Sequence, residues 1–161
     1  MQGETLCVEL NLQRLYQELL PAVYRVAYTY MKNSYDSEDA AQEAFIRLAR
    51  CSRSFQNERE LKSWMLVTVS NVCKDMLRRR QRQDLNLDDY PELSAPMDEK
   101  QELLRAILDL PDKYKSVIYL YYFEGYAVKE IAKVTRQTEG TVKSWLFRAR
   151  KLLKRSLKEE L

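Results

Sequence analysis

Residues 128–150 read VKEIAKVTRQTEGTVKSWLFRAR, and this stretch decides what kind of fold the chain adopts. Val128 to Val134 has the spacing of a short helix, Thr135-Arg136-Gln137 forms a tight turn, and Thr138 is placed to cap a final helix from Glu139 towards Leu157. Two helices around such a turn form a helix-turn-helix, a corner that many helical domains contain and that DNA-binding domains use. The stretch therefore predicts helical structure, and its charged residues indicate which kind of molecule it binds.

The final helix has one apolar and one basic face. With Val142 at zero on a helical wheel, three apolar residues lie within about 40° of it and predict the buried stripe. They are Leu146, Ala149 and Leu153. The outer face consists of Lys143, Ser144, Phe147, Arg148, Lys151, Lys154 and Arg155. A basic face on the second helix of a helix-turn-helix suits DNA, and the alternative is a solvated basic face without a partner.

Upstream of this corner the apolar spacing is also helical. A first helix is expected over Leu12–Met31, where Pro21 predicts either a kink or the start of a second helix. Its expected buried face consists of Leu12, Leu15, Tyr16, Leu19, Val23, Tyr24, Ala27 and Met31. A helix over 36–50 with Asp36 as its cap comes next, and then a helix from about Glu58 to Arg82. The last of these is expected to bury Leu61, Trp64, Met65, Val69, Val72 and Met76.

The expected helices 36–50 and 58–82 carry opposite charges. Asp39, Gln42, Glu43 and Ile46 follow one another at steps of three and four, which gives an acidic stripe around one aliphatic side chain. Such a stripe is either solvated or suited to a basic partner helix. The run Arg78-Arg79-Arg80-Gln81-Arg82 ends the other helix, where the helix dipole favours cations with or without nucleic acid.

Residues 101–123 are expected to form two further helices. The first runs from Gln101 to Leu110 and stops before Pro111. Tyr114 to Phe123 is an apolar run that could be a strand by composition. We predict a helix there, ended by Gly125, because every neighbouring segment is helical. The fold class is therefore all-α.

Charge divides the chain into three segments. Residues 1–82, 83–99 and 100–161 carry +3, −6 and +6 in turn, against +3 for the whole chain of 161 residues. The middle segment has two prolines and no basic residue, which argues against a continuous helix. We therefore predict two small helical domains, 1–82 and 100–161, joined by an acidic linker over 83–99.

Composition excludes several classes of protein. The chain has no histidine, which removes the commonest general base and the usual zinc ligand. Its three cysteines, Cys7, Cys51 and Cys73, are widely spaced and are expected to be free thiols. Without a glycine-rich phosphate loop or metal-ligand spacing, we expect no catalytic residues, metal, cofactor or small-molecule substrate. No signal peptide or long apolar span is present, so a cytoplasmic location is expected.

Two blocks of motifs, in order and at matching spacing, give the chain a resemblance to a known family. The first block is Tyr35 to Phe45 (YDSEDAAQEAF), Trp64, Asn71, Asp75 and Arg78-Arg79, and the second is Leu110-Pro111, Glu130-Ile131-Ala132, Gly140 to Ser144 and Arg148-Ala149-Arg150. Together they resemble the extracytoplasmic-function (ECF) sigma factors of bacterial RNA polymerase. The resemblance implies a sigma region 2 helical bundle in the first domain and a sigma region 4 helix-turn-helix in the second.

The resemblance implies roles for particular residues. Contact with the β′ coiled coil of core RNA polymerase is assigned to Asp36, Glu38, Asp39, Gln42 and Glu43. Contact with the −10 promoter element, with a base flipped near the 51–60 loop, is assigned to Asn71, Lys74, Arg78, Arg79 and Arg82. Contact with the −35 element is assigned to Thr141, Lys143, Ser144, Phe147, Arg148 and Lys151. Other surfaces of the second domain would meet the β flap, and family members are commonly held inactive by an anti-sigma factor.

Three departures from the family pattern bear on local structure. Ala127 stands where a Ser or Thr cap is frequent, Arg136 and Gln137 stand where a Gly and an aliphatic residue are common, and Trp145 replaces a frequent basic residue.

A stand-alone helix-turn-helix regulator is the alternative function, and it would need a dimer to read two half-sites. The acidic 36–50 helix has no evident role in that alternative.

Overall fold

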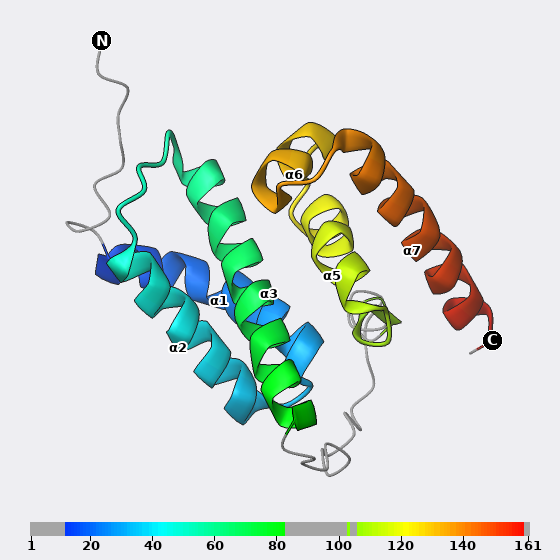
Figure 1. Cartoon of the computed structure of the whole chain (residues 1–161), viewed down its shortest axis with the longest axis horizontal. Coiled ribbons are helices and arrows are strands. Elements are labelled where there is room, and N and C mark those ends of the chain that lie inside the picture. Colours follow the sequence, from blue (N-terminus) through cyan, green and yellow to red (C-terminus); the bar gives the residue numbers. More distant parts are fainter. Residues whose placement is uncertain (1–11, 83–102, 104–105, 160–161) are drawn as a thin grey trace. The chain divides into compact units, whose positions relative to one another are not determined.

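The computed structural model describes residues 12–82, 103 and 106–159, and every regular element within these ranges is helical (Figure 1). The chain divides into two compact units, Met1–Leu85 and Asn86–Leu161. The predicted all-α fold with two helical domains is therefore confirmed. The expected acidic linker over 83–99 lies outside the described residues.

Three helices form the first unit: α1 (Leu12–Met31), α2 (Ser34–Arg50) and α3 (Glu58–Arg82). Each packs against the other two (Figure 1). Alanines on α2 make this close approach possible, since Ala40, Ala41 and Ala44 are at most 1% exposed. Larger side chains of α1 and α3 fill the space around them, among them Leu15, Leu19, Val23, Leu61, Met65, Val69 and Val72.

Helix α1 is a single helix that contains Pro21. The proline side chain is exposed, so the backbone groups that it leaves without a helical hydrogen bond lie on the solvent side. The expected buried face of α1 needs one correction. Tyr16 is 38% exposed, and Leu12 and Tyr24 are half-buried, because these side chains lie at the edge of the face that α2 and α3 cover.

The second unit contains α5 (Asp112–Ile118), a π-helical turn η2 (Tyr119–Phe123), α6 (Val128–Thr135) and α7 (Glu139–Glu159). The prediction of a helix over 114–123 is confirmed. Its C-terminal part is wider than an α-helix, and the Glu124 N–H donates to the Tyr119 carbonyl at 3.3 Å. Gly125 ends the segment with φ +71°, a conformation that costs glycine little. Most of the expected 101–110 helix lies outside the described residues, although Leu103 and 106–108 are helical.

Helix α7 packs on α5 and α6 through the predicted stripe. Val142, Leu146, Ala149 and Leu153 are all buried, at 7% exposure or less. The helical wheel therefore identified the buried face, and with it the face that remains accessible.

Candidate functional site

The N-terminus of α2 is capped by Asn33, and the expected cap Asp36 is wrong. The Asn33 Oδ1 accepts from the Asp36 N–H at 2.8 Å, and its Nδ2 donates to the Asp36 carboxylate at 2.7 Å. The helix therefore begins two residues earlier than predicted, at Ser34. Asn33 and Asp36 are both of a residue type that caps helices, so the point where the helix begins depends on the backbone path.

Asp36 is directed into the first unit. It is 6% exposed and forms an ion pair with Arg80 of α3, whose side chain is 19% exposed. Its carboxylate thus ties the start of α2 to the last turns of α3. The assignment of Asp36 to polymerase contact stays a prediction, and in this structure its carboxylate is directed to Arg80 and Asn33.

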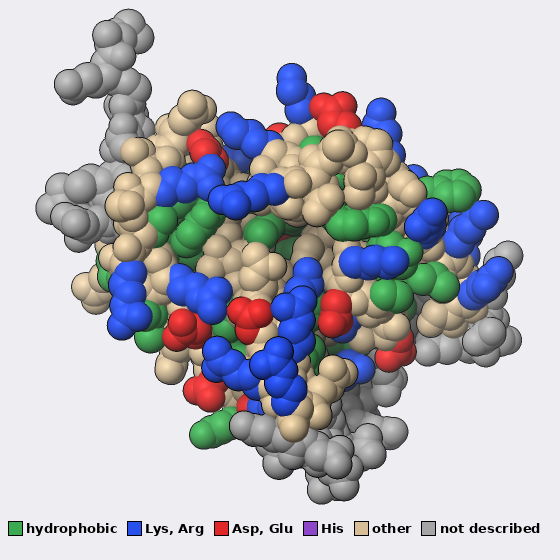
Figure 2. All heavy atoms as spheres, in the orientation of Figure 1, with side chains coloured by type: hydrophobic (Ala, Val, Ile, Leu, Met, Phe, Trp, Pro, Cys, Tyr) green, Lys and Arg blue, Asp and Glu red, His purple; other side chains and the backbone are tan. Residues whose placement is uncertain are grey.

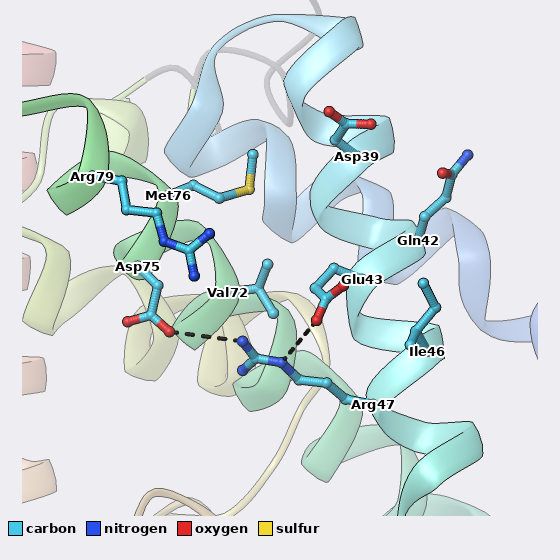
Figure 3. A pocket seen from close by; sticks show the side chains of 9 residues that line it. All are labelled: Asp39, Gln42, Glu43, Ile46, Arg47, Val72, Asp75, Met76 and Arg79. Carbon is cyan, nitrogen blue, oxygen red and sulfur yellow. Dashed lines mark hydrogen bonds and ion pairs between the residues drawn. The ribbon is translucent and has the colours of Figure 1, made fainter. Parts of the chain in front are cut away.

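A groove of about 400 Å³ lies between α2 and α3 (Figure 3). It contains three of the predicted docking residues, Asp39, Gln42 and Glu43. Helix α2 adds Ile46, which is 43% exposed, and Arg47. Helix α3 contributes Val72, Asp75, Met76 and Arg79. The groove therefore has an acidic wall on α2, an apolar floor and cations from both helices.

One ion pair crosses this groove, and a further pair on each helix extends it. The Arg47 side chain extends from α2 towards α3, where its Nε lies 3.5 Å from Glu43 Oε1 and its Nη2 lies 3.7 Å from Asp75 Oδ2 (Figure 3). Asp75 Oδ1 lies 3.6 Å from Nη1 of Arg78. Four alternating charges therefore connect the acidic face of α2 with the basic end of α3.

A second groove, of about 490 Å³, lies between α1 and α2. Tyr16, Leu20, Pro21, Tyr24, Glu38, Ala41 and Gln42 line it. Burial raises the pKa of Tyr24, and the neighbouring Glu38 carboxylate raises it further. Glu38, predicted as a docking residue, thus borders a different groove from Asp39 and Glu43, with Gln42 shared by both. Sequence reasoning missed this groove, because it assigned Tyr16 and Tyr24 to the core.

The predicted −10 residues lie on two faces of α3. At 100° per residue, Asn71, Lys74, Arg78 and Arg82 fall within about 80° of one another. All are exposed except Lys74, which is half-buried. Arg79 is turned about 100° away from Arg78 and lines the groove with α2 instead. Figure 2 shows basic and acidic side chains intermixed over α2 and the C-terminal half of α3.

Trp64 anchors the loop before α3. Its ring meets the buried Phe55 edge to face, with centroids 5.5 Å apart, and the Arg53 guanidinium lies 5.6 Å from the Phe55 centroid. Trp64 and Met76 are expected from the sequence to be buried, and both are half-buried, although the Trp64 ring packs on Phe55. Cys51 is half-buried and Cys73 is buried, and both are free thiols, as predicted.

The helix-turn-helix has the predicted geometry. Thr138 Oγ1 accepts from the Thr141 N–H at 3.1 Å and caps α7. Arg136 ends α6 in the left-handed conformation, with φ 58° and ψ 37°, where an L-residue costs about 1–2 kcal/mol relative to glycine. Ala127 supplies no side-chain acceptor, but its N–H donates to the Glu130 carboxylate at 3.0 Å, which preserves half of a capping box.

The outer face of α7 is accessible and basic. Lys143, Arg148 and Lys151 are exposed, as is Phe147 at 56%. The Lys151 Nζ lies 4.6 Å from the Phe147 ring centroid, which keeps both groups on this face. Thr141, Ser144 and Trp145 are half-buried. Basic side chains follow α7 along the right side of the view in Figure 2.

Arg150 points to another side of α7. It lies 5.6 Å from the ring centroids of both Tyr121 and Tyr122, and its Nε donates to the Tyr122 hydroxyl. The sequence motif contained Arg150 but gave it no role. The structure shows that it holds η2 against α7.

The described residues contain neither a metal-binding cluster nor a membrane-spanning helix. No group of three or more His, Cys, Asp or Glu side chains there is arranged to hold a metal ion. Among the same residues, no helix has both the length and the apolar character needed to span a membrane.

Comparison with known proteins assigns the chain to a family. Residues 15–83 match the family model for Sigma-70 region 2, and residues 100–153 match that for Sigma-70, region 4. RNA polymerase sigma factor SigV of Bacillus subtilis is 31% identical over 141 residues, covering 85% of each chain. ECF RNA polymerase sigma factor SigM of Mycobacterium tuberculosis is 32% identical over 139 residues, covering 84% of this chain and 71% of the relative.

A solved structure has the same fold. It is the sigma factor RpoE of Bartonella quintana, crystallised with the anti-sigma factor NepR. It superposes with a TM-score of 0.70 at 22% identity, covering 91% of this chain and 96% of that one.

The two helical units match the two regions of a promoter-specificity subunit of bacterial RNA polymerase. The chain belongs to the sigma-70 family, in its ECF class. It directs promoter-specific initiation by bacterial RNA polymerase through recognition of −10 and −35 elements, as the resemblance implied.

Proposed function

We propose that the groove-facing side of α2 is the surface that docks on the β′ coiled coil of core RNA polymerase. The observation that carries this proposal is an exposed Ile46 in line with Asp39, Gln42 and Glu43 on one side of a groove. Protein interfaces concentrate binding energy in an apolar centre with charged residues at its rim. A partner helix with basic side chains around an apolar residue fits this face.

The exposed face of α3 binds the melted −10 strand in this proposal. Asn71, Lys74, Arg78 and Arg82 present amide and cationic groups along one side of the helix, which suits a single strand held by its phosphates. Arg79 lies in the groove with α2 and is placed to contact the polymerase as well as DNA. Asp36 acts from within the unit, and Glu38 borders the neighbouring groove.

The outer face of α7 reads the −35 element in the major groove. Lys143, Arg148 and Lys151 supply cations for phosphates and base edges, and the exposed Phe147 ring suits a thymine methyl group. Thr141 and Ser144 lie near the start of the helix, where hydroxyl groups reach the backbone of DNA.

The remaining assignments follow from family membership. The domain boundaries 1–82 and 100–161, contact with the β flap and control by an anti-sigma factor belong to this proposal. So do a cytoplasmic location, where the polymerase and its promoters are, and the absence of any reaction catalysed by the chain itself.

The docking assignment is tested by charge reversal. We expect Asp39→Lys combined with Glu43→Lys to abolish binding to core polymerase, since the two changes place like charges against a basic partner. Co-purification with core enzyme and run-off transcription on genomic fragments measure the effect. Glu18→Lys is the matched control, because Glu18 is an exposed acid on α1. Unchanged core affinity in the double variant, with normal thermal unfolding, would rule out this face.

A further inference from the structure

Asp75 of α3 lies between two arginines. One carboxylate oxygen is 3.7 Å from Arg47 on α2 and the other is 3.6 Å from Arg78 on α3. Both distances exceed those of hydrogen bonds, so these are Coulombic contacts that form and break easily. The Asp75 carboxylate is thus shared between Arg47 and Arg78, and it neutralises neither guanidinium fully.

Arg47 has a second anionic neighbour. Its Nε lies 3.5 Å from Glu43, on the proposed docking face of α2 (Figure 3). Arg78, at the other end of the series, is on the proposed strand-binding face and is 68% exposed. The two residues between them, Arg47 and Asp75, have no assigned role in either surface.

We propose that Asp75 acts as an internal counter-anion that competes with DNA for Arg78 and makes strand binding responsive to the state of Glu43. When cations of a partner occupy Glu43, Arg47 turns fully to Asp75, and Arg78 is released to a phosphate of single-stranded promoter DNA. This inference rests on the proposed function, because it joins the two surfaces assigned there.

The size of the effect follows from exposure. The side chains of Arg47, Asp75 and Arg78 are 39%, 44% and 68% exposed, so water and salt screen the pairs strongly. Removing the anion should tighten binding to a single strand about threefold at low salt. It should also steepen the dependence of log K on log salt by about 0.7, the value for one added phosphate contact on a single strand.

The test uses the full chain and a fluorescent oligo-dT strand, because phosphate contacts do not depend on base sequence. We expect Asp75→Asn to bind this strand about threefold tighter than the natural chain at about 25 mM salt, and Asp75→Glu to restore the original affinity and slope. Glu18→Gln is the control. It also removes one negative charge from the first unit, while Arg14 keeps its shorter ion pair with Glu58 at 2.6 Å.

Three results would overturn the counter-anion role. The first is a change in Asp75→Asn no larger than in Glu18→Gln, which would indicate net charge alone. The second is weaker binding by Asp75→Asn, which would mean that Asp75 holds Arg78 in its binding position. The third is undetectable binding by every variant at low salt, since a released Arg78 would then gain nothing from phosphate.

The link to the docking face is tested by a double-mutant cycle. Glu43→Gln should tighten strand binding on its own, because Arg47 then turns to Asp75, and it should add nothing to Asp75→Asn beyond the Glu18→Gln control. Additive effects would overturn the link. The cycle needs no polymerase, so its failure differs from failure of the docking assignment, which the charge-reversal variant detects through loss of core binding.

Discussion

Asp36 and Asp39 have the same side chain and lie three residues apart on α2, yet their surroundings give them different roles. Asp36 is buried against Arg80, and Asp39 is exposed at the groove. The sequence motif could identify both as members of one acidic block. It could not separate them, because the separation depends on which side of α2 faces the last turns of α3.

Removal of Asp36 should therefore cost stability. We expect Asp36→Ala to lower the free energy of unfolding of the first unit by about 2 kcal/mol, because it removes the largely buried ion pair between Asp36 and Arg80. Urea unfolding followed by Trp64 fluorescence, in a Trp145→Phe background, measures this unit alone. Asp39→Ala is the control and should change stability by less than about 0.5 kcal/mol. Equal stability of the two variants would contradict a stabilising role for the Asp36–Arg80 pair.

At the scale of elements, helical periodicity predicted the faces of α7 correctly and those of α1 in part. In α7 one side packs on α5 and α6 and the other side is exposed, so apolar and basic residues lie on separate faces. In α1 the apolar stripe is wider than the surface that α2 and α3 cover. Tyr16 and Tyr24 therefore line a groove that no count of apolar positions could indicate, because its width depends on helix packing.

The accessible face of α7 gives an element-scale prediction. Arg148→Ala and Lys151→Ala should each weaken transcription that depends on the −35 element, and each should reduce the salt slope of duplex binding by about 0.9 for one lost phosphate contact. Run-off transcription on promoters with intact and scrambled −35 elements measures the first effect. Lys113→Ala, at an exposed lysine of α5, is the control. Transcription that stays equally dependent on the −35 element would mean that another face reads DNA.

For the whole molecule, the net charges of the three segments predicted two small units. The two family models match the same two parts of the chain. What the sequence could not supply is the network through Arg47 and Asp75. It joins residues of two helices whose distance depends on the alanines between them.

Two small modules should bind DNA weakly by themselves. A single reading module buries about 600–1,000 Å² on DNA, so the polymerase has to supply the rest of the affinity by holding both modules near one promoter. We expect the free chain to give no promoter footprint at concentrations where the chain with core polymerase gives a complete one. DNase I footprinting at physiological salt makes the comparison. A full footprint by the chain alone would favour a stand-alone regulator.

In the π-helical turn at Tyr119–Phe123, the number of residues determines which way the side chains point. A turn of this kind accommodates one residue more than an α-helix does, and each residue rotates a helix by about 100°. Loss of a single residue from this segment would tighten it to an α-helix and turn Tyr122 away from Arg150. The contact of Arg150 on α7 with Tyr121 and Tyr122 on η2 therefore depends on the additional residue that the π-helical turn accommodates.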